Sequence, residues 1–149
     1  MVSGLLNRSG MKITTPWLAA VILILSACSE SSSPTGPDTA RLGAPFRLSP
    51  GESVSVEGER LRVRFERVKS DVRCPVTVQC IWAGAATVAL SVEVLGAPAE
   101  AVDIVISGYR HPTRVSGYEI EVRQLLPDRQ NMSQRIDQNR YRVELLVTR

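Results

Sequence analysis

Three cysteines and a single histidine are the side chains of this protein best suited to nucleophilic, redox or metal chemistry. Cys28 stands alone near the N-terminus, Cys74 and Cys80 are separated by five residues, and His111 lies in a turn-like context before Pro112. A closed zinc site takes four protein ligands, and one cysteine pair with one histidine falls short of that number. We therefore expect no metal site and no cofactor.

Catalytic constellations are also missing from the sequence. A nucleophilic hydrolase needs a serine or thiol with a base and an orienting group, but there is no Gly-x-Ser-x-Gly and His111 is the only histidine. Glu119 and Glu121 share one face of a predicted strand beside Arg123, which is typical of a solvated strand face. No glycine-rich phosphate loop is present. The sequence therefore predicts a protein that is not an enzyme.

The N-terminal segment has the pattern of an export signal. Residues 17–25 are almost wholly apolar, and Arg8 and Lys12 precede them with no acidic residue. A spanning helix needs about 20 apolar residues, so a run of nine is too short to stay in the membrane. We expect residues 1–27 to be a signal peptide that is removed.

The four residues Leu25-Ser26-Ala27-Cys28 resemble the lipobox of bacterial lipoproteins. The resemblance implies that the Cys28 thiol carries diacylglycerol, so that two or three acyl chains tether the mature protein firmly to a membrane. Ser29 follows Cys28, which resembles a sorting signal for the periplasmic side of the outer membrane. The alternative is an ordinary secretory signal with a chance cysteine at its end.

Beyond Cys28 the composition separates a tether from a domain. Residues 28–41 contain no large apolar residue and predict a flexible tether about 20 Å in root-mean-square span, whereas residues 42–149 are the size of one domain. Loss of the signal peptide lowers the number of Lys and Arg from 18 to 16 against 15 acidic residues, and the net charge from +3 to +1. A near-neutral domain excludes nucleic acid as an expected partner.

Two-residue alternation of apolar and polar side chains dominates residues 42–149. Such a period places the apolar set on one face of a sheet and the polar set in water. We expect strands around Phe46–Leu48, 54–56, 61–65, 88–94, 102–106, 118–122 and 141–147. Short Gly and Pro turns favour antiparallel neighbours, so the predicted fold is an all-β, immunoglobulin-like antiparallel β-sandwich of about seven strands.

Polar residues outside the expected core form one long segment and several charged strand positions. Residues 127–139 are almost entirely polar and predict an exposed loop or a single helical turn. Outward arginines share their parity with outward acids, so we expect ion pairs across neighbouring strands. The residues concerned are Arg60, Arg62, Arg64, Arg140 and Arg142 with Glu66, Glu119, Glu121 and Glu144.

The second and third cysteines predict a disulfide, because an isolated pair in an exported, oxidising setting is most simply bridged. Trp82 follows Cys80 by two residues, so in an extended strand both side chains would point to the same face. We expect Trp82 to pack beside the bridge in the core. The alternative is an exposed aromatic side chain that binds a sugar or a partner protein.

The spacing Arg73-Cys74-Pro75, four residues, Cys80, one residue, Trp82, one residue, Gly84 resembles a motif of exported bacterial lipoproteins of uncharacterised activity. In those proteins a serine often precedes the arginine, and Val72 replaces it here. The resemblance supports the expected fold and implies no activity.

Together these patterns predict a membrane-anchored lipoprotein of the cell envelope that binds an envelope protein or glycan through its loops. Arg73 and Trp82 are the expected partner contacts. The alternative is an inhibitor or accessory subunit that inserts the disulfide-braced loop 74–80 into the cleft of an envelope protease or hydrolase. A rigid insert suits that role because little ordering is lost on binding.

Overall fold

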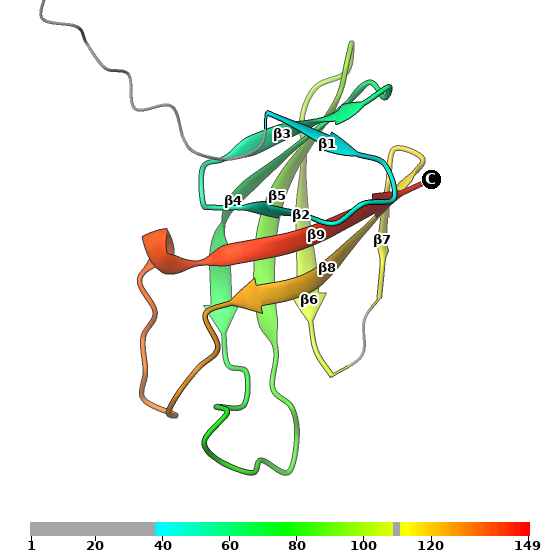
Figure 1. Cartoon of the computed structure of the whole chain (residues 1–149). Helices are drawn as coiled ribbons and strands as arrows, with labels where there is room; N and C mark the ends of the chain where they lie inside the picture. The colour runs from blue at the N-terminus through cyan, green and yellow to red at the C-terminus, as the bar shows by residue number, and fades with distance from the viewer. Residues whose placement is uncertain (1–37, 109–110) are drawn as a thin grey trace, which may run out of the picture. The chain divides into compact units, whose positions relative to one another are not determined.

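The computed structural model describes residues 38–108 and 111–149 (Figure 1). This part of the chain contains nine strands and a short 3-10 helix, η1. The strands are β1 (Thr39–Arg41), β2 (Phe46–Leu48), β3 (Ser53–Glu57), β4 (Leu61–Asp71), β5 (Ala86–Val94), β6 (Glu100–Ile106), β7 (Thr113–Val115), β8 (Tyr118–Leu126) and β9 (Arg142–Thr148). The helix η1 is Gln138–Arg140. The predicted signal peptide, Cys28 and most of the predicted tether lie outside the described residues.

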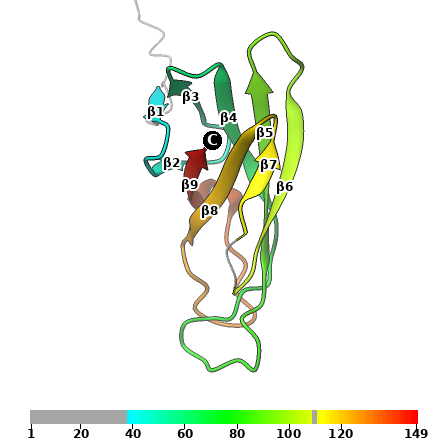
Figure 2. The ribbon, with the colours of Figure 1, turned by 90° about the vertical axis from the view of Figure 1, so that its right-hand side faces the viewer.

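The strands form two sheets that pack face to face (Figure 2). One sheet has the order β1-β3-β4-β5-β6 and the other β2-β9-β8-β7. Every pairing is antiparallel except that of β1 with β3, which is parallel. The predicted all-β antiparallel sandwich is therefore confirmed, with nine strands in place of seven.

The two strands that the alternation pattern missed, β1 and β7, have three residues each and bury only one of them, whereas β2, equally short, was predicted because Phe46 and Leu48 alternate with Arg47. β1 also corrects the predicted end of the tether. Thr39–Arg41 pairs with β3, and Ala40 is buried in the core although it is small. Backbone pairing with an existing strand, not a large apolar side chain, holds this segment in the sandwich.

The core lies between the sheets and follows the predicted alternation. Leu61, Val63 and Phe65 of β4 are buried while the arginines between them are exposed, and β5, β8 and β9 repeat the arrangement. The bulkiest fully buried side chains are Phe65, Leu48, Leu90, Ile120 and Leu145. Burial of each stabilises the fold by about 1.5–3 kcal/mol relative to exposure.

Several outward charges form ion pairs across neighbouring strands. Arg47 of β2 pairs with Glu144 of β9 at 2.9 Å, and Arg114 of β7 pairs with Glu119 of β8 at 2.6 Å. Glu144 and Glu119 therefore pair across strands as expected, but their partners are Arg47 and Arg114 and none of the predicted arginines. Such exposed pairs contribute about 0–1 kcal/mol each, so they shape the surface more than they stabilise the fold.

Two long loops project from one end of the sandwich, which we call the loop end (Figure 1). The β4–β5 loop, residues 72–85, and the β8–β9 loop, residues 127–141, form it. Gly108, after β6, lies beside them, since a Cβ there would be 3.4 Å from the Cβ of Ala83. No helix within residues 38–108 and 111–149 is long and apolar enough to cross a membrane.

Candidate functional site

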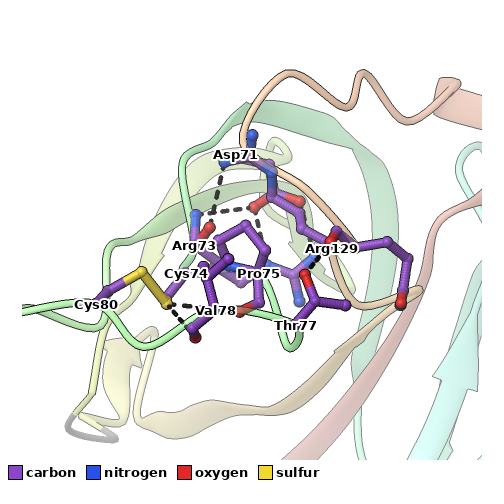
Figure 3. Close-up of a disulfide and its surroundings, with 9 residues drawn as sticks. Asp71, Arg73, Cys74, Pro75, Thr77, Val78, Cys80 and Arg129 are labelled. Carbon is purple, nitrogen blue, oxygen red and sulfur yellow. Dashed lines mark hydrogen bonds and ion pairs between the residues drawn. A yellow bond between two sulfur atoms is a disulfide. The ribbon is translucent and has the colours of Figure 1, made fainter.

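The predicted disulfide is present at the loop end. The sulfur atoms of Cys74 and Cys80 are 2.06 Å apart and their Cα atoms 6.0 Å apart. The strands on either side continue as a narrow hairpin, because the amide of Val72 donates to the Ala85 carbonyl and that of Cys74 to the Ala83 carbonyl, both at 2.8 Å. The bridge therefore closes a ring at the tip of an extended β4–β5 hairpin (Figure 3).

Replacing both bridged cysteines, as Cys74→Ser with Cys80→Ser, is expected to lower the free energy of unfolding by about 2 kcal/mol. The loss arises because a short closed loop restricts the unfolded chain, by an amount that depends only logarithmically on loop length. Urea unfolding of the oxidised protein and the double variant measures it, and the wild type in reducing agent should match the variant. An unchanged midpoint would contradict the prediction.

Gly84 lets the two arms of this hairpin approach each other. Its φ is +69°, in the region that favours glycine, and a Cβ there would overlap the backbone oxygen of Val72 and lie 2.9 Å from the Cα of Arg73. Gly58, in the β3–β4 turn, also has a positive φ of +74°, but a Cβ there would meet nothing within 4 Å. Gly84 therefore meets two requirements, conformational and steric, where Gly58 meets only the first.

The variant Gly84→Ala should lower the free energy of unfolding by about 3 kcal/mol, because the left-handed conformation and the displaced Val72 backbone both cost energy. The matched control Gly58→Ala should cost about 1 kcal/mol, because only the conformation is strained. Urea unfolding of both variants gives the comparison. Equal losses would show that the close approach at Gly84 contributes nothing.

Arg73 joins the two loops of the loop end. Its Nε and Nη2 donate to the two carboxylate oxygens of Asp71 at 2.8 and 2.7 Å, a bidentate pair. Its Nη1 also donates to the carbonyl of Leu125 at 2.6 Å, and Nη2 to that of Pro127 at 2.9 Å. The side chain is only 16 % exposed. These internal acceptors use its donors, so Arg73 braces the fold, and its contact with a partner stays a prediction.

Asp71 and Tyr141 extend the contact into the core. Tyr141 donates from its hydroxyl to Oδ2 of Asp71 at 3.1 Å. Burial by itself raises the pKa of Asp71, but the hydrogen bonds and charge of Arg73 outweigh it, so the net pKa is lowered. Burial, followed by the charge of Asp71, raises the pKa of Tyr141 to about 12. At neutral pH the ion pair is therefore charged and the tyrosine neutral.

Arg129 provides a second connection between the loops. Its Nη1 donates to the Arg73 carbonyl at 3.2 Å and its Nη2 to the Met132 carbonyl at 2.6 Å. In return the amide of Val76 donates to the Arg129 carbonyl at 2.9 Å, and Thr77 Oγ1 donates to the Gln130 carbonyl. Together with Arg73, these contacts fix the cysteine ring against the β8–β9 loop.

Residues 127–139 are thus only partly the exposed loop that the sequence predicts. The predicted helical turn is present as η1, but Arg129 is 8 % exposed and is the one buried charged residue in the part of the chain that the structure describes. Sequence reasoning missed Arg129. No local pattern distinguishes it from the neighbouring arginines, since its acceptors are backbone carbonyls, one three residues away at Met132 and one more than fifty residues away at Arg73.

Apolar side chains cover the outside of this braced structure. Six large hydrophobic residues of the loop end are exposed, and we call them the apolar tip: Val72, Val76, Val78, Ile81, Trp82 and Met132. Ile81 is fully exposed and Trp82 is 67 % exposed. The expectation that Trp82 packs in the core is therefore wrong, because the β4–β5 hairpin extends past the sheets and no second sheet covers it.

His111, the single histidine of the sequence, is exposed. Within residues 38–108 and 111–149, no group of three or more His, Cys, Asp or Glu side chains could hold a metal ion.

Apart from Trp82, each fixed residue of the Arg-Cys-Pro-x4-Cys-x-Trp-x-Gly motif has a role inside the fold. Arg73 connects the loops, Cys74 and Cys80 close the ring, and Gly84 allows the close approach, while Pro75 is buried. Trp82 alone in this motif turns most of its surface to solvent. Comparison with protein-family models, with curated proteins and with solved structures finds no match.

Proposed function

We propose that this protein is a membrane-anchored lipoprotein of the cell envelope that binds a partner protein through its apolar tip, without catalysis. The observation that carries the proposal is the exposure of Trp82 and Ile81 on a loop that internal contacts hold rigid. Tryptophan is enriched among the residues that dominate binding energy at protein interfaces. Trp82 is therefore the proposed centre of the contact.

The distribution of exposed apolar residues supports this assignment. Within residues 38–108 and 111–149, nine large hydrophobic side chains are exposed, and six of them form the apolar tip. The other three, Leu42, Leu95 and Val105, are dispersed over the sandwich. Single exposed apolar residues are common on soluble proteins, whereas several on two neighbouring loops at one end of the fold favour an interaction surface.

The bracing beneath the tip also favours binding. The disulfide, the Arg73 contacts and the Arg129 contacts hold the loops in place before a partner arrives. A preorganised surface loses less conformational entropy on association, so more of the contact energy contributes to affinity. The disulfide and hydrogen bonds that hold these loops in place are therefore consistent with a recognition role.

The membrane anchor rests on the sequence, where the Leu25-Ser26-Ala27-Cys28 lipobox supports lipidation of Cys28 and Ser29 supports the periplasmic side of the outer membrane. The sandwich adds a geometric argument. The chain enters the sandwich at β1, which pairs with Ser55 of β3, and Ser55 in turn pairs with Arg62 of β4. Asp71, the last residue of β4 before the loop end, lies nine residues beyond Arg62. At about 3.3 Å per residue, the tip lies about 30 Å or more from that junction. A tether there can hold the tip away from the anchoring membrane.

The contacts of the cysteine ring weigh against the protease-inhibitor alternative. Residues 75–78 form a turn in which the Val78 amide donates to the Pro75 carbonyl at 3.3 Å, and Val76 and Thr77 already bond to the β8–β9 loop. Insertion into a protease cleft in the manner of a substrate needs an extended segment with free backbone groups. This ring braces the loop end instead.

Site-specific photocross-linking in cells tests the binding surface. A photoreactive amino acid at Ile81 should yield one discrete protein adduct, whereas the same group at Leu95, exposed in the β5–β6 turn, should not. The Ile81 adduct should weaken when Trp82→Ala is added. The same adduct from both positions would contradict the proposal, and adducts with the mass of a glycan or phospholipid would replace the protein partner by that ligand.

Metabolic labelling with palmitate tests the anchor separately. The full chain should incorporate label and sediment with membranes, and Cys28→Ser should lose both properties. Label that persists in Cys28→Ser would overturn the lipobox assignment without affecting the binding surface.

A further inference from the structure

A concave polar site lies beside the contacts that join the two loops. It has a volume of about 440 Å³ and forms where the second half of β4 meets the β8–β9 loop. The edge of β4 is not paired with a strand there, and the Gln138 side chain bonds the Val68 amide at 3.0 Å and its carbonyl at 2.8 Å instead. The charged and polar side chains that line the site include Lys69, Asp71, Arg129, Gln134, Arg135 and Tyr141.

The charges around this site do not balance. Its only carboxylate, Asp71, is occupied by Arg73 and by the Tyr141 hydroxyl, and Lys69 is paired with Asp103. In the part of the chain that the structure describes, neither Arg129 nor Arg135 forms an ion pair with a carboxylate. Two arginines thus line one concave site without a carboxylate partner among the described residues.

Arg129 adds a second, independent observation. Its Nη atoms donate to carbonyls, but its Nε is fully buried and has no acceptor among the described residues. A buried donor without an acceptor costs about 1–3 kcal/mol, so native proteins satisfy nearly all such groups with protein, water or a ligand. An uncompensated buried guanidinium raises that cost further.

From these observations we propose that the site binds a small oxyanion, a carboxylate or phosphate group, between Arg129 and Arg135. Guanidinium groups suit such ligands because their planar donors match the spacing of two anion oxygens. Arg135 is exposed and lines the same concave site as Arg129, so the two side chains can bind one anion together. The proposal rests on this site alone and does not depend on lipidation or on the apolar tip.

Arginine side-chain NMR gives a direct test. In the mature protein, the Nε–Hε signal of Arg129, identified by its loss in Arg129→Lys, should shift saturably with sodium phosphate or sodium acetate but not with sodium chloride at equal ionic strength. The half-saturation concentration should be on the order of 1–10 mM for so small a ligand. Stronger binding of phosphate than acetate would identify a phosphate-bearing ligand, and the reverse a carboxylate-bearing one.

Two variants decide whether the shift reports this site. Arg135→Gln should weaken the response at least about fivefold, because one of the two cations is removed. The control Arg140→Gln, in η1 and outside the lining of the site, should leave it unchanged. No saturable shift up to about 100 mM, an equal response to chloride, or equal weakening by both variants would overturn the proposal.

Discussion

Replacing Arg73 with methionine is expected to lower the free energy of unfolding by about 4 kcal/mol at neutral pH. The variant leaves the Asp71 carboxylate, 6 % exposed, without its bidentate partner, and it removes the donors of the Leu125 and Pro127 carbonyls. Breaking a buried ion pair from one side typically costs 3–5 kcal/mol, because the remaining charge is uncompensated. Urea unfolding measures the loss.

A surface pair serves as the matched control for Arg73→Met. Arg47 bonds Glu144 at 2.9 Å, but its side chain is 60 % exposed. Arg47→Met should therefore cost at most about 1 kcal/mol, since water solvates the remaining glutamate. Equal losses from Arg47→Met and Arg73→Met would show that burial of the Asp71 pair adds nothing.

The pH dependence separates loss of charge compensation from loss of packing. In the wild type the pKa of Asp71 is lowered from 3.8, so the stabilisation is complete above that value and declines as the pH falls below it. In Arg73→Met, burial remains without the opposing influence of the arginine, and the pKa of Asp71 is raised. Protonation then relieves the uncompensated charge. The stability gap between the two proteins should therefore narrow between about pH 7 and pH 4, and a constant gap would contradict the ionic explanation.

The double variant Asp71→Asn with Arg73→Met, compared with each of its two single variants, completes a double-mutant cycle. It should be more stable than Arg73→Met alone, because the asparagine carries no charge to leave buried. Residues in one hydrogen-bonded network commonly couple by about 0.5–3 kcal/mol. Additive losses would contradict a direct interaction between the two side chains.

The sequence predicted the sandwich because its alternation is local information. The alternation of Leu61, Val63 and Phe65 with polar residues predicts a strand with one buried face, independently of distant parts of the chain, and all three side chains are buried in the structure. The disulfide followed in the same way from two cysteines close together in the chain. Thr39–Arg41, which has one small buried residue and no alternating pair of apolar side chains, carries no such signal and depends on a neighbouring strand.

The interior of the loop end could not be predicted in this way. Arg73 binds carbonyls at Leu125 and Pro127, more than fifty residues along the chain, and Arg129 binds the Arg73 carbonyl across the same separation. These acceptors are backbone atoms, which every residue possesses, so no residue type marks them. The sequence therefore singled out Arg73 as a partner contact, but it could not show the role that Arg73 has in joining the two loops.

Trp82→Ala is expected to weaken binding of the partner cross-linked from Ile81 by about 30-fold or more, the effect of losing a central interface residue worth about 2 kcal/mol or more. Stability should change by less than about 0.5 kcal/mol, because the side chain is 67 % exposed and replacing it opens no cavity. The matched control Leu95→Ala removes an equally exposed apolar side chain, 64 %, from the β5–β6 turn, and should change neither quantity.

The chain itself supplies the probe for this measurement. It has two tryptophans, and Trp17 lies in the predicted signal peptide, so Trp82 is the sole tryptophan expected in the mature protein. Its emission should be that of a solvated indole and should shift to shorter wavelength as the partner covers it, which gives the affinity by titration. An emission typical of a buried indole in the free protein, or a large loss of stability in Trp82→Ala, would show that the Trp82 side chain is buried in the core. Unchanged affinity in a stable Trp82→Ala would remove it from the interface.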